Sequence, residues 1–193
     1  MIEINTKMLK DLERRLGTYS SKAPLVLARA LNRAAQNTKS NISKKTRETY
    51  TAKAKDIKDT IRISNANSYR LGAVVYSRGN LIALDKFKIS PTQANPKKVP
   101  KKIKVSVKKG NVSEFMHAFI ANIQGNKLFQ RVGKARLPIK RLMGPAVPQM
   151  IDNAMIRKFV EKEAKTTFDK RLEHEIKRVL EGNKWYLHFC KIF

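Results

Sequence analysis

The sequence has very few of the residues that covalent cross-linking and metal binding need. One cysteine, Cys190, occurs among 193 residues, so an internal disulfide is excluded, which fits a reducing compartment. We expect Cys190 to be a small, partly buried hydrophobic residue. The three histidines have none of the spacings of zinc ligands, and we expect His117 to pack in a strand. No metal site and no cofactor are predicted.

Acidic residues are scarce too. The chain has 15 Asp and Glu against 42 Lys and Arg. Phosphodiester hydrolysis usually needs clustered carboxylates to hold metal ions, and the few acids before the last predicted helix are scattered. Glu163-Ala-Lys165 is similar to a nuclease fragment, but it lies in a helical pattern with no Asp on a preceding strand. Phosphate-binding glycine loops and nucleophile motifs are also missing, so we predict that the protein is not an enzyme.

Long apolar runs are absent as well. None approaches the roughly 20 residues that span a bilayer. The first six residues lack the charged start and the apolar stretch of a signal peptide. From these two absences we expect a soluble, cytoplasmic protein.

Positive charge dominates what is present. The formal net charge is +27, whereas an apolar fraction of 41% is enough to build a core. So much charge repels itself in a compact state, which predicts a polyanionic partner. Nucleic acid is the first candidate and an anionic membrane the second. The length favours one domain, predicted over residues 1–182, with a long basic loop at about 85–102 and an apolar tail over 183–193.

The predicted elements are helices, then strands, then a helix. Asn5 and Gly17 bound a first helix, and Pro24 begins a second. Thr51 is expected to cap a short third helix. A long helix is predicted from about Ala146 to Gly182. This order favours an α+β fold with a central antiparallel sheet.

Apolar residues at helical spacing predict the buried faces of these helices. The second helix has a stripe of apolar residues and one Thr, and the last helix has two connected stripes. The residues of the second helix are Leu27, Ala28, Leu31, Ala35, Thr38 and Ile42. Those of the last helix are Ile151, Met155 and Phe159, then Ala164, Phe168, Leu172, Ile176 and Leu180.

Alternating residues predict the strands. Residues 61–63, 71–77, 81–84, 103–107, 115–123 and 128–132 read as strands. A turn at Arg78-Gly79-Asn80 predicts that the second and third of these form a hairpin, and Gln124-Gly125-Asn126 predicts a tight turn before the last. Prolines favour an extended loop over the first half of residues 86–109.

Two basic stretches are the candidate nucleic-acid contacts. Residues 86–109 hold nine Lys and no acid, and residues 125–150 hold six Lys or Arg and no acid. Such side chains neutralise phosphates without reading sequence, and motifs that read bases are absent. An aromatic pair like that of an RNA-recognition sheet is not found either. The candidates are Lys97, Lys98, Lys101, Lys102, Lys127, Arg131, Lys134, Arg136, Lys140 and Arg141.

In the second stretch, alternation predicts a buried face opposite the basic one. Leu128, Val132, Leu137, Ile139 and Leu142 are expected to point inward. Phe129 breaks the alternation and is expected to pack on a neighbour. The alternative to a DNA-binding face is that the charges face solvent or acidic partner subunits.

The C-terminus is apolar and aromatic. Trp185, Tyr186, Phe189 and Phe193 follow a charged helix and need burial. They can pack on the chain's own core, dock on a neighbouring subunit or insert into a membrane. We take them as subunit-interface candidates, because aromatic clusters anchor interfaces.

Several short motifs occur together in a fixed order. They are Ala23-Pro24, Ala28-Arg-Ala-Leu-Asn-Arg-Ala34, Thr46-Arg-Glu48, Ala118-Phe-Ile120, Gln130-Arg-Val132, Leu137-Pro-Ile139 and Gly144-Pro-Ala-Val-Pro148. This run resembles the minor tail protein Z family of long-tailed bacteriophages and prophages, over roughly residues 20–155. The terminus from Trp185 departs from the family pattern.

The resemblance implies a structural protein of the virion that is assembled in the host cytoplasm. It would complete the head-proximal end of the tail as a ring of copies around the DNA path. The implied partners are tail terminator, tail tube and head-completion proteins and non-specific double-stranded DNA, without a membrane. The alternatives are a stand-alone non-specific nucleic-acid-binding protein and an enzyme that acts on DNA.

Overall fold

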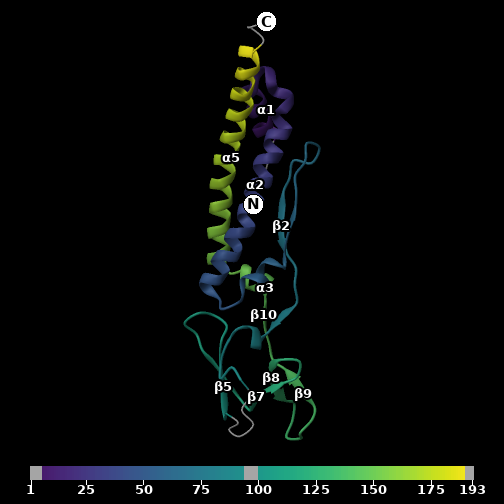
Figure 1. Ribbon diagram of the computed structural model, residues 1–193, viewed down its shortest axis with the longest axis vertical. Coiled ribbons are helices and arrows are strands. Elements are labelled where there is room, and N and C mark those ends of the chain that lie inside the picture. Colours follow the sequence, from purple (N-terminus) through teal and green to yellow (C-terminus); the bar gives the residue numbers. More distant parts are fainter. Residues whose placement is uncertain (1–5, 94–99, 190–193) are drawn as a thin grey trace. The chain divides into compact units, whose positions relative to one another are not determined.

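The computed structural model describes residues 6–93 and 100–189 (Figure 1). Helices and small antiparallel sheets are both present, which confirms the α+β class. The chain folds into two compact units. Unit 1 comprises residues 1–42, 62–76 and 157–193, and unit 2 comprises residues 43–61 and 77–156. The expectation of a single domain over residues 1–182 stays a prediction.

Unit 1 is mainly helical. It contains α1 (Thr6–Leu16), the 3-10 helix η1 (Gly17–Lys22), most of α2 (Ala23–Thr49) and most of α5 (Ala154–Phe189). Gly17 directly follows α1 with φ +54, a conformation that glycine adopts without strain, so the predicted helix end is confirmed. Pro24 lies in the first turn of α2, where its missing N–H costs nothing.

The core of unit 1 lies where α1, α2 and α5 run side by side (Figure 1). Small alanines on α2 let the helices approach, and Leu27 and Phe168 fill the space between them, with exposed fractions of 0% and 1%. The buried α2 residues of this cluster recur at spacings of three and four. They are Ala23, Val26, Leu27, Ala28, Ala30, Leu31 and Ala34. The predicted stripe was confirmed at Leu27, Ala28, Leu31, Ala35 and Ile42, but the buried face is wider.

The predicted C-terminal helix is two helices. α4 (Val147–Ile151) has Asp152 as its C-cap, and α5 begins at Ala154. This break changes which side chains point inward, so the prediction for Met155 was wrong: it is 77% exposed, and Ile156 is buried instead. The later stripe was right at Phe168, Leu172 and Ile176. Gly182 does not end the helix, because α5 continues to Phe189.

Unit 2 is built from short strands together with α3 (Ala54–Lys58) and α4. The strands are β3 (Leu81–Ala83), β4 (Lys88–Ser90), β5 (Lys102–Ser106), β6 (Ser113–Met116), β7 (Ala118–Asn122), β8 (Asn126–Arg131), β9 (Ile139–Arg141) and β10 (Met143–Ala146); the 3-10 helix η2 (Leu84–Lys86) follows β3. They form the antiparallel sheets β10-β3, β4-β5-β6 and β7-β8-β9. The expected single central sheet is therefore divided.

The core of unit 2 comes from alternate strand residues and from the short helices. Ile103 and Val105 on β5 are fully buried, as their alternation with Lys and Ser predicted. Leu128 on β8 is fully buried too. Ile57 of α3 and Val147 of α4 are likewise 0% exposed. Full burial of such an aliphatic side chain contributes roughly 1.5–3 kcal/mol.

Several local predictions about the strands were wrong. The hairpin through Gly79 does not form, since β2 (Val74–Ser77) pairs with β1 (Ile61–Ser64) and β3 pairs with β10. Residues 115–123 are not one strand, because His117, with φ +57, separates β6 from β7. Thr51 does not cap α3; its hydroxyl donates to the carbonyl oxygen of Ser106.

Candidate nucleic-acid interface

The sheet β7-β8-β9 carries four of the ten candidate basic residues. In its register Phe129 lies opposite Arg141, and Gln130 opposite Lys140. Residues that face each other across a ladder share a face of the sheet, and faces alternate along a strand. Lys127, Arg131 and Arg141 therefore lie on one face with Phe129. Lys140 lies on the opposite face, with the buried Leu128.

An aromatic pair lies on the same face as Arg131. Phe119 is opposite Phe129, and their ring centroids are 6.2 Å apart. The guanidinium carbon of Arg131 is 5.5 Å from the centroid of Phe119, which is cation–π geometry. Arg131 Nη1 also donates to the carbonyl oxygen of Arg136 at 2.6 Å. Sequence reasoning missed this pair, although Phe129 was expected to pack on a neighbour.

Arg141 is committed to a contact inside unit 2. Its Nε and Nη2 donate to Asp85 Oδ1 and Oδ2 at 3.0 and 2.8 Å, a two-point ion pair that links β9 to η2. The hydrogen bond to Asp85 raises the pKa of the Arg141 guanidinium; burial opposes this, and attraction to Asp85 adds to it. The Arg141 charge is thus balanced locally, and we assign it a structural role.

Lys102 is also paired, on β5. Its Nζ lies 2.7 Å from Glu114 Oε2 on β6, and Lys104 Nζ lies 3.7 Å from Glu114 Oε1. The hydrogen bond from Lys102 lowers the pKa of the Glu114 carboxyl; burial opposes this, and both lysines attract the carboxylate. Lys101, the residue before Lys102, is exposed. Lys97 and Lys98 lie outside the described residues.

Five exposed candidates remain without a described carboxylate partner; one is Arg131, at the end of β8. Lys134 and Arg136 lie in the loop between β8 and β9, Lys140 lies on β9, and Lys101 immediately precedes β5. All belong to unit 2. The prediction that Val132 and Leu137 point inward was wrong, because they are 60% and 67% exposed. The loop therefore exposes apolar side chains beside the basic Lys134 and Arg136.

A second basic surface lies in unit 1. Arg29 and Arg33 of α2 line a groove with Arg171, His174 and Arg178 of α5. Within it Glu175 lies 3.8 Å from Arg29 and 3.5 Å from Arg178, measured between nitrogen and carboxylate oxygen. On α2 the two arginines are four residues apart, and on α5 the three basic residues are separated by three, four and seven positions. Side chains at such spacings lie on one face of a helix. Only tertiary structure brings the two helices together.

The aromatic interface candidates are described less fully. Trp185, Tyr186 and Phe189 fall in the last turns of α5, in a part of the chain whose side chains lie outside the described set. Phe193 lies beyond the described residues. Their assignment to a subunit interface stays a prediction.

The whole chain, rather than any one pair of residues, decides the family. A family model described as prophage minor tail protein Z (GPZ) matches residues 7–182. The chain belongs to the minor tail protein Z family. No curated protein and no solved structure matches it significantly. The resemblance found over residues 20–155 is confirmed and extends in both directions, and the aromatic terminus from Trp185 lies outside the match.

Membership in the minor tail protein Z family makes this chain a structural minor tail protein of a bacteriophage or prophage, and so a virion component. The family is a structural one and is not known for catalysis. In the described part of the chain, no helix is long and apolar enough to cross a membrane.

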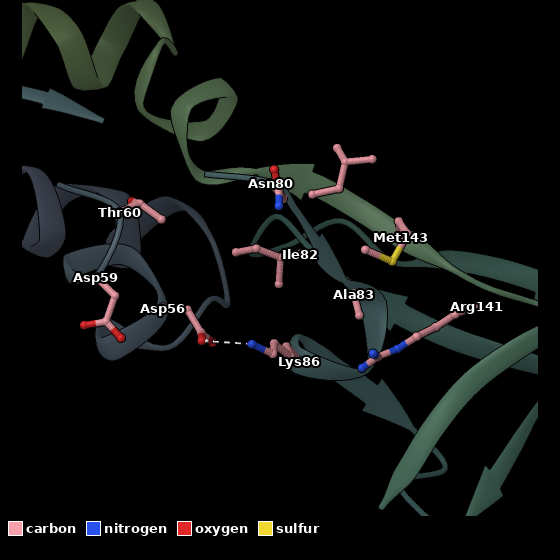
Figure 2. Close-up of a pocket in the computed structure, with 10 residues that line it drawn as sticks. Asp56, Asp59, Thr60, Asn80, Ile82, Ala83, Lys86, Arg141 and Met143 are labelled. Atoms are coloured by element: carbon pink, nitrogen blue, oxygen red, sulfur yellow. Dashed lines mark hydrogen bonds and ion pairs between the residues drawn. The ribbon is translucent and has the colours of Figure 1, made fainter. Parts of the chain in front are cut away.

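One hollow of unit 2 holds an ion pair (Figure 2). It is about 320 Å³ and is lined by residues of α3, β3, η2, β9 and β10. The Asp56 carboxylate faces Lys86, with Oδ1 3.2 Å from Nζ, whereas Asp59 points away from Lys86. Among residues 6–93 and 100–189, no three His, Cys, Asp or Glu are grouped closely enough to hold a metal ion. The hollow therefore contains a salt bridge, and its described residues form no group of metal ligands.

Proposed function

We propose that this member of the minor tail protein Z family completes the head-proximal end of the tail, as a ring of copies that lines the DNA path. It contacts double-stranded DNA through phosphates alone. Its neighbours are the tail terminator, the tail tube and the head-completion proteins. Family membership favours this virion role over that of a stand-alone nucleic-acid-binding protein.

The observation that carries the proposal is the set of exposed basic side chains in unit 2 that no described carboxylate neutralises. Lys101, Lys134, Arg136 and Lys140 project from loops and strand edges. Elsewhere in unit 2 the carboxylates Asp85 and Glu114 already pair with Arg141 and Lys102. The unpaired cations suit a polyanion, and the chain carries +27 in all.

Contacts of this kind also suit DNA that must move. Phosphate contacts position a duplex but carry no sequence information. Such a surface holds any DNA sequence equally and lets the duplex slide during ejection. The binding constant should therefore depend on salt and vary little between unrelated duplexes.

The test is the salt dependence of DNA affinity. Each phosphate neutralised contributes roughly −0.9 to the slope of log K against log salt concentration. Replacing Lys134, Arg136 and Lys140 together with Gln should make the slope shallower by about one to three units. A matched control replaces three exposed lysines of α5 with Gln, giving the same change in net charge. These are Lys158, Lys162 and Lys165.

Two outcomes count against DNA lining. An unchanged slope in the unit 2 variant would show that the loop serves a protein partner or solvent. An equal effect in the α5 control would show that only net charge matters. Position is tested separately: a gold label on a tagged chain should mark the head-proximal end of isolated tails, and a label at the other end would refute the proposal.

A further inference from the structure

The segment from β1 to β2 is held firmly against the helices of unit 1. Asn32 of α2 donates from Nδ2 to the carbonyl oxygen of Ala66 at 2.9 Å and accepts from the Ala66 N–H at 2.7 Å. Ala66 is buried in the helical core, and Leu71 and Ala73 pack against it. One side of the segment is therefore fixed, and we call residues 61–77 the ribbon.

The tip of the ribbon is ordered by its own side chains. Asn67 Oδ1 accepts from the backbone N–H groups of Tyr69 and Arg70, at 3.1 and 2.6 Å. Arg70 Nη2 donates to Ser64 Oγ at 2.8 Å and to the carbonyl oxygen of Asn65 at 3.0 Å. This turn presents Tyr69 with 99% of its surface exposed. An exposed aromatic side chain on a turn whose backbone is held by hydrogen bonds suits an interface anchor, because little backbone entropy is lost when it is buried.

Strand β2 continues this exposed apolar surface. Val74 and Tyr76 are two residues apart, so they lie on the same face of β2, and they are 56% and 50% exposed. Among the described residues β2 pairs with β1 alone, so its second edge has no described strand partner. Such an edge can accept another strand by main-chain hydrogen bonds.

The ribbon also lacks the usual protection of an edge. Lysines and prolines commonly keep exposed edges from pairing. The chain has 28 lysines, yet none occurs between Lys58 and Lys86, and no proline does either. Residues 71–77 hold no charged residue, and the charged residues of the ribbon are Arg62 and Arg70, so it carries +2 of the chain's +27.

The lack of charge along residues 71–77 indicates which partner the ribbon contacts. Two copies that each carry +27 repel each other, so they associate best through a surface poor in charge. DNA or an acidic protein would instead be drawn to the basic surfaces. We propose that the ribbon, through the outer edge of β2 and the side chains of Tyr69, Val74 and Tyr76, contacts the next copy of this chain in the assembled tail. This rests on the ring in the proposed function.

Photo-crosslinking tests the contact directly. Benzoylphenylalanine replaces Tyr76 in one full-length variant and Val112 in a control, since Val112 of unit 2 is similarly exposed at 60%. Tails assembled in cells are irradiated and analysed on denaturing gels. A ladder of dimer and higher multiples is expected from position 76 and not from position 112.

A lysine-reactive crosslinker on wild-type tails separates the two proposals. A ladder with this reagent but none from position 76 refutes the ribbon contact and leaves the ring intact. No ladder with either reagent refutes both. Crosslinks from position 76 to a different protein show that the ribbon binds that protein, which also refutes the proposal.

Charge substitution gives a second test. Val74→Lys should reduce the copy-to-copy crosslinks by about tenfold or more, because the new charge faces a like-charged copy. Val112→Lys adds the same charge and should leave the yield unchanged. Tyr69→Ala, at the exposed tip, should lower the yield while the urea midpoint stays at the wild-type value. Normal yields from both ribbon variants would overturn the inference.

Discussion

Asn32 is the side chain through which α2 holds the ribbon. Its amide makes two hydrogen bonds to the backbone of Ala66, at 2.9 and 2.7 Å. Each bond contributes about 1 kcal/mol net, and Ala66 is only 6% exposed, so its freed N–H and carbonyl are left poorly solvated. We expect Asn32→Ala to lower the free energy of unfolding by about 2 kcal/mol.

Asn37 provides a matched control on the same helix. Its Nδ2 makes one hydrogen bond, to Thr167 Oγ1 at 2.7 Å. Asn37→Ala should therefore cost about half as much, near 1 kcal/mol. Both variants remove the same atoms from α2, so intrinsic helix propensity cancels in the comparison. The difference between the two losses of unfolding free energy measures the contribution of the second hydrogen bond between Asn32 and Ala66.

Urea unfolding and hydrogen exchange measure the two effects. With a slope of about 2 kcal/mol/M, Asn32→Ala should lower the urea midpoint by about 1 M. Amide exchange should accelerate over residues 61–77 in this variant and stay unchanged there in Asn37→Ala. If Asn32→Ala costs no more than Asn37→Ala, or leaves the exchange of the ribbon unchanged, the anchoring role of Asn32 is wrong.

Two further predictions concern packing and pH. Gly144→Ala should cost about 1–3 kcal/mol in urea unfolding, because its Cβ would lie 2.9 Å from the buried Leu84 side chain. Gly133→Ala, with no atom within 4 Å, is the control and should be near neutral; equal losses would refute the packing argument. The hydrogen bond from Arg15 lowers the pKa of Glu173, against a smaller opposing effect of burial. A lowered folded-state pKa adds stability above the unfolded value of about 4.3, and this is lost as pH falls through the folded value. Glu173→Gln should therefore cost less than about 1 kcal/mol at pH 7, since the pair is half exposed, and the cost should be smaller at about pH 3. An equal cost at both pH values would contradict this.

Sequence alone identified the features that local patterns encode. The helical spacing of Leu27, Leu31, Phe168 and Leu172 predicted their burial, and alternation predicted that of Ile103. These follow from the 3.6-residue and two-residue periods of helix and strand, which each segment carries by itself. The positive charge, the α+β class and the family were likewise available from the sequence.

Tertiary structure alone decided which partners distant residues have. The pairing of β3 with β10, and of Arg141 with Asp85 across 56 positions, cannot be read from a local pattern. Such contacts depend on which segments share a core, so sequence could not separate the paired Arg141 from the exposed Lys140. The same holds for the groove between α2 and α5 and for the edge of β2 that pairs with no described strand. An edge is defined by the strand that does not pair with it, and that is a property of the whole fold.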